Sequence, residues 1–221
     1  RKILSIALCL ALVMSYVPMV GVTAKALSDG VTDASIYDGD RDGRYEIGSS
    51  EQLTVFANLV NGGNTTLKVE LVSDVVFDGE TPWVPIGSIY DPFEGIFDGQ
   101  FYTISGLYIN DTTMKDVGLF GTIAASGRVK NVGVINSKFI TTRRGDGYSA
   151  GGIAVLNRGR IEQCYVENTT IQANGAGGIV SVNDGYIDNC YTDATIKGNF
   201  AGGIANSNFG CIYASIGTSS V

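Results

Sequence analysis

The sequence predicts an all-β fold, a parallel β-helix with coils of about 25 residues, and three observations support it. A segment that begins at Gly151 returns at Gly177 and again at Gly202, each time as Gly-Gly-Ile followed by an Asn-containing turn. A period of this length is typical of a solenoid. Each copy contains short runs of β-branched and small residues that are too short for helices. Thirty glycines and four prolines in 221 residues fit such a turn-dense chain.

Corners of the coil are predicted by pairs of residues three positions apart. Such residues point to opposite faces of a flat strand, so a bend must separate them if both side chains face the core. In the copy that begins at Gly151 the bend falls at Glu162-Gln163. The aligned pairs are Ile104/Leu107, Val129/Val132, Ile161/Cys164, Ile187/Cys190 and Ile212/Ser215. We therefore expect at least five stacked coils.

Residues 1–26 have the pattern of a secretion signal. Basic Arg1-Lys2 precedes a long apolar run, and Ala24-Lys25-Ala26 is a small-residue cleavage site. The run is long enough that an uncleaved membrane anchor is the alternative. Cleavage leaves 12 basic against 22 acidic residues, a net charge of −10. Such a surface disfavours nucleic acid and anionic lipid as partners.

The complete absence of histidine limits the chemistry of this chain. Histidine is the usual general base and the commonest metal ligand, and it activates serine and cysteine nucleophiles. Hydrolase mechanisms that depend on such pairs are therefore excluded from this segment. We expect no catalytic residues here.

Residues 27–66 are predicted to form an acidic turn and an N-terminal cap. Ser49 and Gln52 resemble a capping box that starts one short helix at about 50–61. Its apolar stripe consists of Leu53, Phe56, Ala57 and Val60. This stripe is expected to cover the open first coil of the solenoid. Residues 67–221 are predicted to be the repeats, truncated before a C-terminal cap.

An ordered set of motifs over about residues 45–216 resembles bacterial surface proteins with the GLUG motif. The motifs are Glu46-Ile47 before Gln52-Leu53, Trp83-x-Pro85-Ile86-Gly87, Phe93-x-Gly95-x-Phe97-Asp98-Gly99, Thr103-Ile104-x-x-Leu107-x-Ile109 and Gly118-Leu119-Phe120-Gly121. The resemblance implies a right-handed β-helix on an exported, adhesin-like protein. The chain also resembles the N-terminal repeat region of zinc peptidases that cut immunoglobulin A. It contains no His-Glu-x-x-His, so the resemblance supplies no catalytic residues.

An acidic turn is the candidate metal site. Asp38, Asp40 and Asp42 alternate before Gly43, as in the first half of a calcium loop. The twelfth position of that loop is Ser49 in place of the usual glutamate, so Glu46 or Glu51 would have to substitute. A solvated acidic turn without an ion is the alternative. Bound calcium would pin the junction ahead of the helix.

Other positions are candidate binding groups. Arg144-Gly145-Asp146 lies in the one long insertion between coils and is an integrin-recognition triplet, although charged glycine-rich tips are also ordinary loop sequences. One asparagine recurs at the same turn of three coils, where it either satisfies backbone groups or forms a ligand-binding row: Asn157, Asn183 and Asn208. Tyr165 and Tyr191 are expected one above the other, either stacking on sugar rings or packing between coils.

The cysteines have two interpretations. Cys164 and Cys190 occupy equivalent positions in adjacent coils, with Cα atoms about 4.8 Å apart. That separation permits a disulfide, but stacked side chains run parallel rather than toward each other. The alternative is a ladder of small buried side chains.

The favoured function is a non-catalytic extracellular repeat module for surface adhesion or carbohydrate and matrix binding, and a rigid spacer. The expected location is secreted or at the bacterial cell surface. Expected partners are a host glycan or matrix protein and further domains beyond Val221, with no nucleic acid and no membrane after signal cleavage. The alternatives are a polysaccharide-degrading lyase or hydrolase, and the non-catalytic front end of a larger secreted peptidase.

Overall fold

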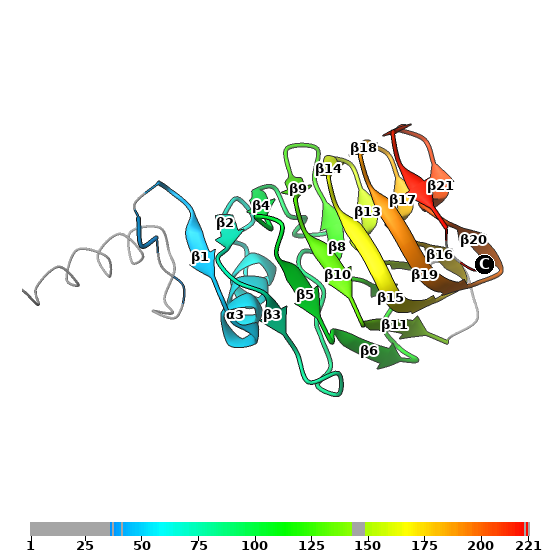
Figure 1. Ribbon diagram of the computed structural model, residues 1–221, viewed down its shortest axis with the longest axis horizontal. Helices are drawn as coiled ribbons and strands as arrows, with labels where there is room; N and C mark the ends of the chain where they lie inside the picture. The colour runs from blue at the N-terminus through cyan, green and yellow to red at the C-terminus, as the bar shows by residue number, and fades with distance from the viewer. Residues whose placement is uncertain (1–35, 37, 41, 143–148, 219, 221) are drawn as a thin grey trace, which may run out of the picture.

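The computed structural model describes residue 36 and residues 38–40, 42–142, 149–218 and 220. These residues form a parallel β-solenoid of about six turns with one short helix (Figure 1). The prediction of an all-β solenoid is confirmed. Among the described residues the strands of all four sheets pair in parallel, and strands at equivalent positions of successive turns are neighbours.

Two of the sheets run the length of the solenoid. The strands of the seven-stranded sheet are, in spatial order, β1 (Tyr45–Ile47), β2 (Lys68–Leu71), β4 (Ile96–Asp98), β9 (Arg128–Lys130), β14 (Arg160–Glu162), β18 (Tyr186–Asp188) and β22 (Cys211–Tyr213). The strands of the eight-stranded sheet are β3 (Val75–Val76), β5 (Thr103–Ser105), β6 (Tyr108–Asp111), β10 (Gly133–Ile135), β11 (Lys138–Thr141), β15 (Tyr165–Gln172), β19 (Tyr191–Lys197) and β23 (Ile216–Gly217). β1 precedes the helix in the chain, yet it pairs with β2.

Two shorter sheets complete the later turns. One contains β7 (Asp116–Val117), β12 (Ser149–Gly151), β16 (Gly175–Gly177) and β20 (Phe200–Gly202). The other contains β8 (Phe120–Ile123), β13 (Ala154–Asn157), β17 (Val180–Asn183) and β21 (Ala205–Asn208). Both start at the third turn, because the earlier turns use that space for the helix and for the irregular segment between β3 and β4.

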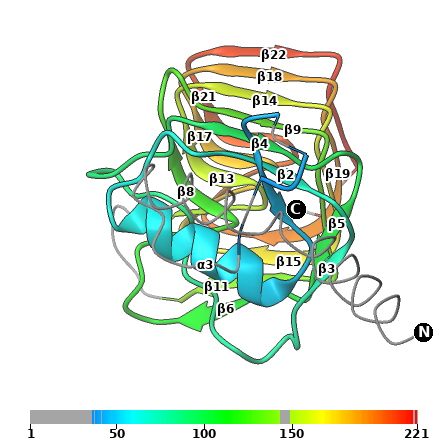
Figure 2. The same cartoon turned by 90° about the vertical axis from the view of Figure 1, so that its left-hand side faces the viewer.

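The helix α3 (Ser50–Asn61) lies across the N-terminal end of the solenoid (Figure 2). The Ser49 side chain accepts a hydrogen bond from the Gln52 backbone N–H, and the Gln52 side chain accepts one from the Gly48 N–H. All four residues of the predicted apolar stripe are buried, and the helix spans the residues that the sequence predicts. At its far end the Asn61 amide bonds the backbone of Pro85 and Gly87, which anchors the helix to the next turn.

An aromatic cluster joins the helix to the coils. Phe56 packs against Phe93 and Phe97 with ring centroids 5.9 Å apart, and both of these contact Phe120. All four side chains are fully buried. Beyond them the core narrows to columns of β-branched residues, one per turn, such as Val129, Ile161, Ile187 and Ile212. Buried apolar area of this kind is the main stabilising contribution to the fold.

The predicted corners are present. Gln163 has a φ of 52°, and its equivalents Asn131, Asn189 and Ala214 have φ values of 55°, 51° and 43°. This left-handed conformation reverses the side-chain alternation and turns both flanking residues inward. Asparagine tolerates it better than most residues, which explains part of the repeat signature.

One alignment of the corner pairs is wrong. Ile104 pairs with Val134 in the eight-stranded sheet, and Phe97 takes the position below Val129. A second corner of the same form caused the error, because Gly106, with a φ of 72°, and Asn136, with a φ of 50°, bend the chain there. Core-facing residues that flank either corner are therefore three positions apart, so the spacing alone does not distinguish the two corners.

The turns are unequal in length. Partner residues are 26 positions apart from Ile161 to Ile187 and 25 apart from Ile187 to Ile212. They are 32 apart from Phe97 to Val129 and again from Val129 to Ile161. The predicted period thus describes the last turns, and the two turns before them are longer.

Candidate functional site

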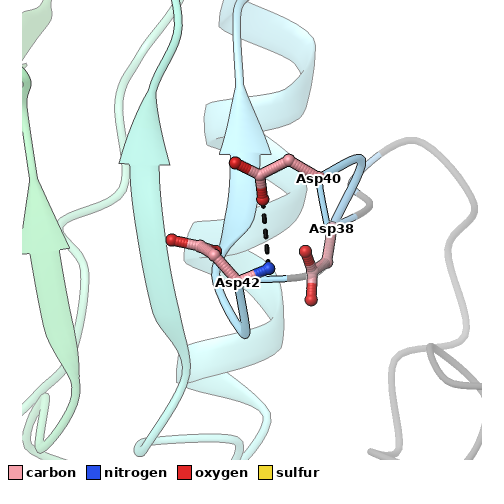
Figure 3. A group of neighbouring side chains, drawn as sticks. All are labelled: Asp38, Asp40 and Asp42. Atoms are coloured by element: carbon pink, nitrogen blue, oxygen red, sulfur yellow. Dashed lines mark hydrogen bonds between the residues drawn. The ribbon is translucent and has the colours of Figure 1, made fainter.

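The predicted calcium ligands lie in one loop directly before β1 (Figure 3). Asp38, Asp40 and Asp42 each offer one oxygen, and the three atoms lie within 4.8 Å of one another. Asp38 is buried, whereas Asp40 and Asp42 are exposed. Because calcium binds oxygens at about 2.3–2.6 Å, oxygens on opposite sides of an ion are about 4.8 Å apart, so this spacing fits the ion.

The same carboxylates also organise the loop itself. Asp38 accepts a hydrogen bond from the Gly43 N–H at 3.0 Å, Asp40 from the Asp42 N–H at 3.1 Å, and Asp42 from the Arg44 N–H at 2.8 Å. Neither Glu46 nor Glu51 belongs to the converging group found among the described residues. Calcium normally takes six to eight oxygens, so water or other groups would have to supply the remainder.

A buried carboxylate that the sequence analysis missed anchors this loop to the solenoid. Asp98 on β4 is 2% exposed and forms ion pairs with Arg44, at 3.2 Å, and with Lys130. Burial alone raises the pKa of Asp98, but hydrogen bonds from Lys130, Asn131 and the Gln100 N–H outweigh it and hold the pKa below its usual value. Asp98 is therefore charged at neutral pH and ties the loop to two turns.

The three repeat asparagines form a ladder inside the solenoid. Asn157 donates to the side-chain oxygen of Asn183 at 2.8 Å, and Asn183 donates to that of Asn208 at the same distance. Asn157 and Asn183 are fully buried. Their side-chain oxygens also accept from the backbone N–H of Gly159 and Gly185. These amides are used within the turns and face the interior, which favours the structural interpretation over a ligand-binding row.

Replacement of Asn183 by alanine should lower the free energy of unfolding by about 2 kcal/mol, because the buried amide of Asn157 loses its shorter acceptor and keeps only the Tyr186 carbonyl. Asn208 is the matched control, since it occupies the same position at the exposed end of the ladder. Asn208→Ala should cost less than half as much. Urea unfolding, monitored by circular dichroism, measures the stability of both variants. Equal losses of stability would contradict the idea that a ladder asparagine stabilises the fold in proportion to its burial.

Cys164 and Cys190 are free thiols in a ladder of small groups, and both are buried. Cys164 donates to the Glu162 carbonyl two residues earlier, Cys190 to that of Asp188, and Ser215 to that of Tyr213. A small donor at this corner satisfies a carbonyl that the bend exposes, which explains why serine can replace cysteine. Burial raises the pKa of the Cys164 thiol well above its ordinary value, so it stays protonated and unreactive.

Tyr165 and Tyr191 pair on adjacent strands of the eight-stranded sheet, as predicted, and both are half-buried on its outer face. A shallow hollow lies beside them. Its lining residues are Gln163, Cys164, Tyr165, Glu167, Asn189 and Tyr191.

Partial loss of hydration raises the pKa of Asp116, although its side chain remains exposed, and Lys115 opposes the shift. It lies in a hollow beside the Asn61 and Pro85 contact. The residues that line this hollow include no second carboxyl group. The arrangement therefore lacks the pair of carboxyl groups that glycoside hydrolysis uses.

Two predictions fall outside the described residues. Arg144, Gly145 and Asp146 lie in the undescribed segment 143–148, and the predicted leader 1–26 lies in the undescribed segment 1–35. Within the part of the chain that the structure describes, no helix is both long and apolar enough to cross a membrane.

No protein-family model matches the chain. A curated relative in Evansella cellulosilytica, named "Putative Gly-rich membrane protein", is 30% identical over 148 residues. The matched region covers 63% of this chain and 17% of that protein, so the chain spans about a sixth of the relative's length.

A solved structure shares the fold. It is the crystal structure of a "putative immunoglobulin A1 protease" from Bacteroides ovatus, with a TM-score of 0.62 and 26% sequence identity. The similarity covers 79% of this chain and 57% of that chain. The resemblance to immunoglobulin A-cleaving proteins is thus supported at the level of the solenoid. This chain is similar to a β-solenoid portion of a longer protein.

Proposed function

We propose that this chain is a non-catalytic extracellular module that acts as a rigid spacer and binds glycans or matrix proteins through the outer faces of its coils. The observation that carries the proposal is the in-register repetition of outward side chains. Tyr165 lies beside Tyr191, Glu167 beside Asp193, and Thr170 beside Thr195, each one strand apart. A strand spacing of about 4.8 Å lets weak contacts on successive turns act together on one extended ligand.

The electrostatics favour binding over catalysis. A general acid needs a carboxyl group with a raised pKa, and Asp116 has no carboxyl partner in its hollow. Two other carboxylates are paired with cations: Glu162 pairs with Arg128 and Arg160, and the buried Asp98 pairs with Lys130. This pattern supports a surface that binds ligands and stabilises the fold, rather than a site that degrades polysaccharides.

The module is proposed to belong to a larger protein of the GLUG-motif type, with right-handed coils. Connections between parallel strands of one sheet are almost always right-handed. A surface or secreted location fits the name of the relative in Evansella cellulosilytica. The solved structure named as a protease supports a second role, the non-catalytic front end of a secreted peptidase, because this chain also covers only part of that one.

Calcium is proposed as an accessory to this module. Asp38, Asp40 and Asp42 would hold the ion through their converging oxygens. Calcium would there neutralise three neighbouring carboxylates and stiffen the loop that Arg44 connects to Asp98.

Binding of the full chain to an array of glycans and matrix proteins, with and without calcium, tests the function. Specific binding without cleavage is the expected result. Release of shortened or unsaturated sugar products would overturn it and favour the enzyme. If chelation does not change binding or thermal stability, the calcium role is wrong while the module role stands. Asp40→Asn is the variant that tests the proposed calcium ligands with little effect on the fold. Asp40 is exposed, and among the contacts described its side chain bonds only the Asp42 backbone N–H.

A further inference from the structure

The hollow on the outer face of the eight-stranded sheet combines two aromatic rings with unpaired polar groups. It has a volume of about 580 Å³ and lies where β15 and β19 leave the corner. Tyr165 and Tyr191 contribute the rings, Gln163 and Asn189 the corner amides, and Glu167 a carboxylate. Together these groups line one continuous concave surface.

The two rings diverge, which is why a hollow exists between them. The Tyr165 ring lies over the preceding turn, because a Cβ atom added to Gly133 would stand 2.6 Å from the Tyr165 hydroxyl oxygen. The Tyr191 hydroxyl reaches the following turn, where it lies 3.4 Å from the Thr218 hydroxyl. Rings that stacked directly would fill this space with their own side chains. Here each ring leaves part of its surface to a ligand.

Gly133 explains how Tyr165 can lie flat. It is the partner of Tyr165 in the register, and any side chain at that position would collide with the ring. Ile216 follows Tyr191 in the same column, and Thr103 precedes Gly133. The pair of tyrosines is therefore confined to one place on this face in the described turns, and the hollow is a single site rather than one of a row.

The corner amides are available for a ligand. Gln163 and Asn189 have left-handed backbones, with φ values of 52° and 51°, and exposed side chains. Among the described residues, neither side chain has a hydrogen-bond partner, and the Glu167 carboxylate has none either. The two amides stand on successive turns, one strand spacing apart, next to the two rings. Amides can both donate and accept, as recognition of hydroxyl groups requires.

The charges around the hollow exclude an anionic occupant. Glu167 and Asp193 are adjacent in the register. Asp188 lies just across the corner, next to Glu162, which is already paired with two arginines. Burial raises the pKa of Tyr165, and the nearby carboxylates of Glu167 and Asp74 raise it further. Uronate or sulfated sugars would be repelled by this set of negative charges.

We propose that this hollow binds one unit of a neutral glycan, with the apolar face of the sugar against Tyr191 and its hydroxyl groups on Gln163, Asn189 and Glu167. Aromatic rings that offer an apolar face, with amides and a carboxylate beside it, form the mixed lining that small polar ligands require. The inference rests on the proposed binding function, for which it supplies the site and the ligand class.

The test measures dissociation constants of the full chain for hexamers of glucose, mannose and N-acetylglucosamine, with hexagalacturonate as the anionic comparison. At least one neutral hexamer should bind and hexagalacturonate should not. Tyr191→Ala should weaken binding about tenfold or more, equivalent to about 1.4 kcal/mol. Asn189→Gly removes the amide and suits the left-handed backbone, so it should weaken binding without unfolding the chain.

Tyr186→Ala is the matched control. Tyr186 is also an outward tyrosine, 47% exposed, but it lies on the seven-stranded sheet beneath Arg160. It should change binding by less than about twofold. Undiminished binding by Tyr191→Ala and Asn189→Gly would overturn this site and leave the module function intact. A preference for hexagalacturonate would overturn the ligand class. Failure to bind any glycan or matrix protein would overturn the proposed function as well.

Discussion

Replacement of Gly178 by alanine should lower the free energy of unfolding by roughly 3 to 5 kcal/mol, because a single methyl group cannot be accommodated between two turns. A Cβ atom at Gly178 would overlap the backbone carbonyl oxygen of Gly203 in the next turn and would stand 2.5 Å from the Thr192 hydroxyl oxygen. A backbone atom cannot move aside as a flexible side chain does. The turns would have to separate, which would weaken the hydrogen bonds between neighbouring strands.

Gly203 is the matched control for this prediction. It holds the same position in the next copy, but the nearest atom to an added Cβ is the Gly217 Cα at 3.4 Å, an ordinary contact. Gly203→Ala should therefore change the free energy of unfolding by less than about 1 kcal/mol. Urea unfolding midpoints of the two variants decide the matter. Similar losses would show that the glycine is needed for its own backbone conformation and not for the approach of the next turn.

This pair of glycines also explains why the fold could be predicted from sequence. The Gly-Gly-Ile signature marks a place where each turn touches the next through backbone atoms. A Cβ at the first glycine, as at Gly177, would overlap the carbonyl of Val180 in the same turn, and one at the second, as at Gly152 and Gly178, would overlap the following turn. Steric requirements repeated in every turn leave a repeated sequence. The same holds for the left-handed corner at Asn189 and for the buried ladder residue Asn183.

The sequence predicted less where the turns are not alike. Ile104 was aligned with the wrong corner because two corners share the same local requirement, and only the register distinguishes them. The two longer turns hid the place of Phe97 below Val129. Ile104 stands 25 residues before Val129, as Ile187 stands before Ile212, whereas the true partner Phe97 stands 32 residues before Val129.

The candidate site, too, could be predicted from the sequence only in part. Asp38, Asp40 and Asp42 could be predicted to converge because they are neighbours in the chain. The ion pairs of Asp98 join it to residues on other turns that are far away in the chain, and Asp98 itself appeared in the sequence only as part of a turn motif. The tyrosine pair could be predicted from the repeat. The hollow beside it could not, since it depends on side-chain directions that Gly133 and Thr218 determine.

Replacement of Asp98 by alanine should lower the free energy of unfolding by about 3 kcal/mol, the second largest loss that we predict. The substitution would leave Arg44 and Lys130, whose side chains are 29% and 23% exposed, facing each other without the carboxylate between them. Asp184→Ala is the matched control, because Asp184 forms an exposed pair with Arg158 at 3.9 Å. It should change stability by no more than about 0.5 kcal/mol. Equal losses would mean that the Asp98 network contributes no more than a surface pair.

The pH dependence of unfolding separates the charge of Asp98 from its packing. Because hydrogen bonds from Lys130 and Asn131 hold the folded pKa below the ordinary value of about 3.9, the contribution is complete well above that value. It is lost as the pH falls below about 4 toward the lowered pKa of the folded state. The difference in stability between the wild-type chain and Asp98→Asn should therefore be largest near neutral pH and shrink in acid. A difference that stays constant from neutral pH into acid would assign the effect to packing and hydrogen-bond geometry, because protonation of Asp98 would then have no consequence for the loop that Arg44 holds in place.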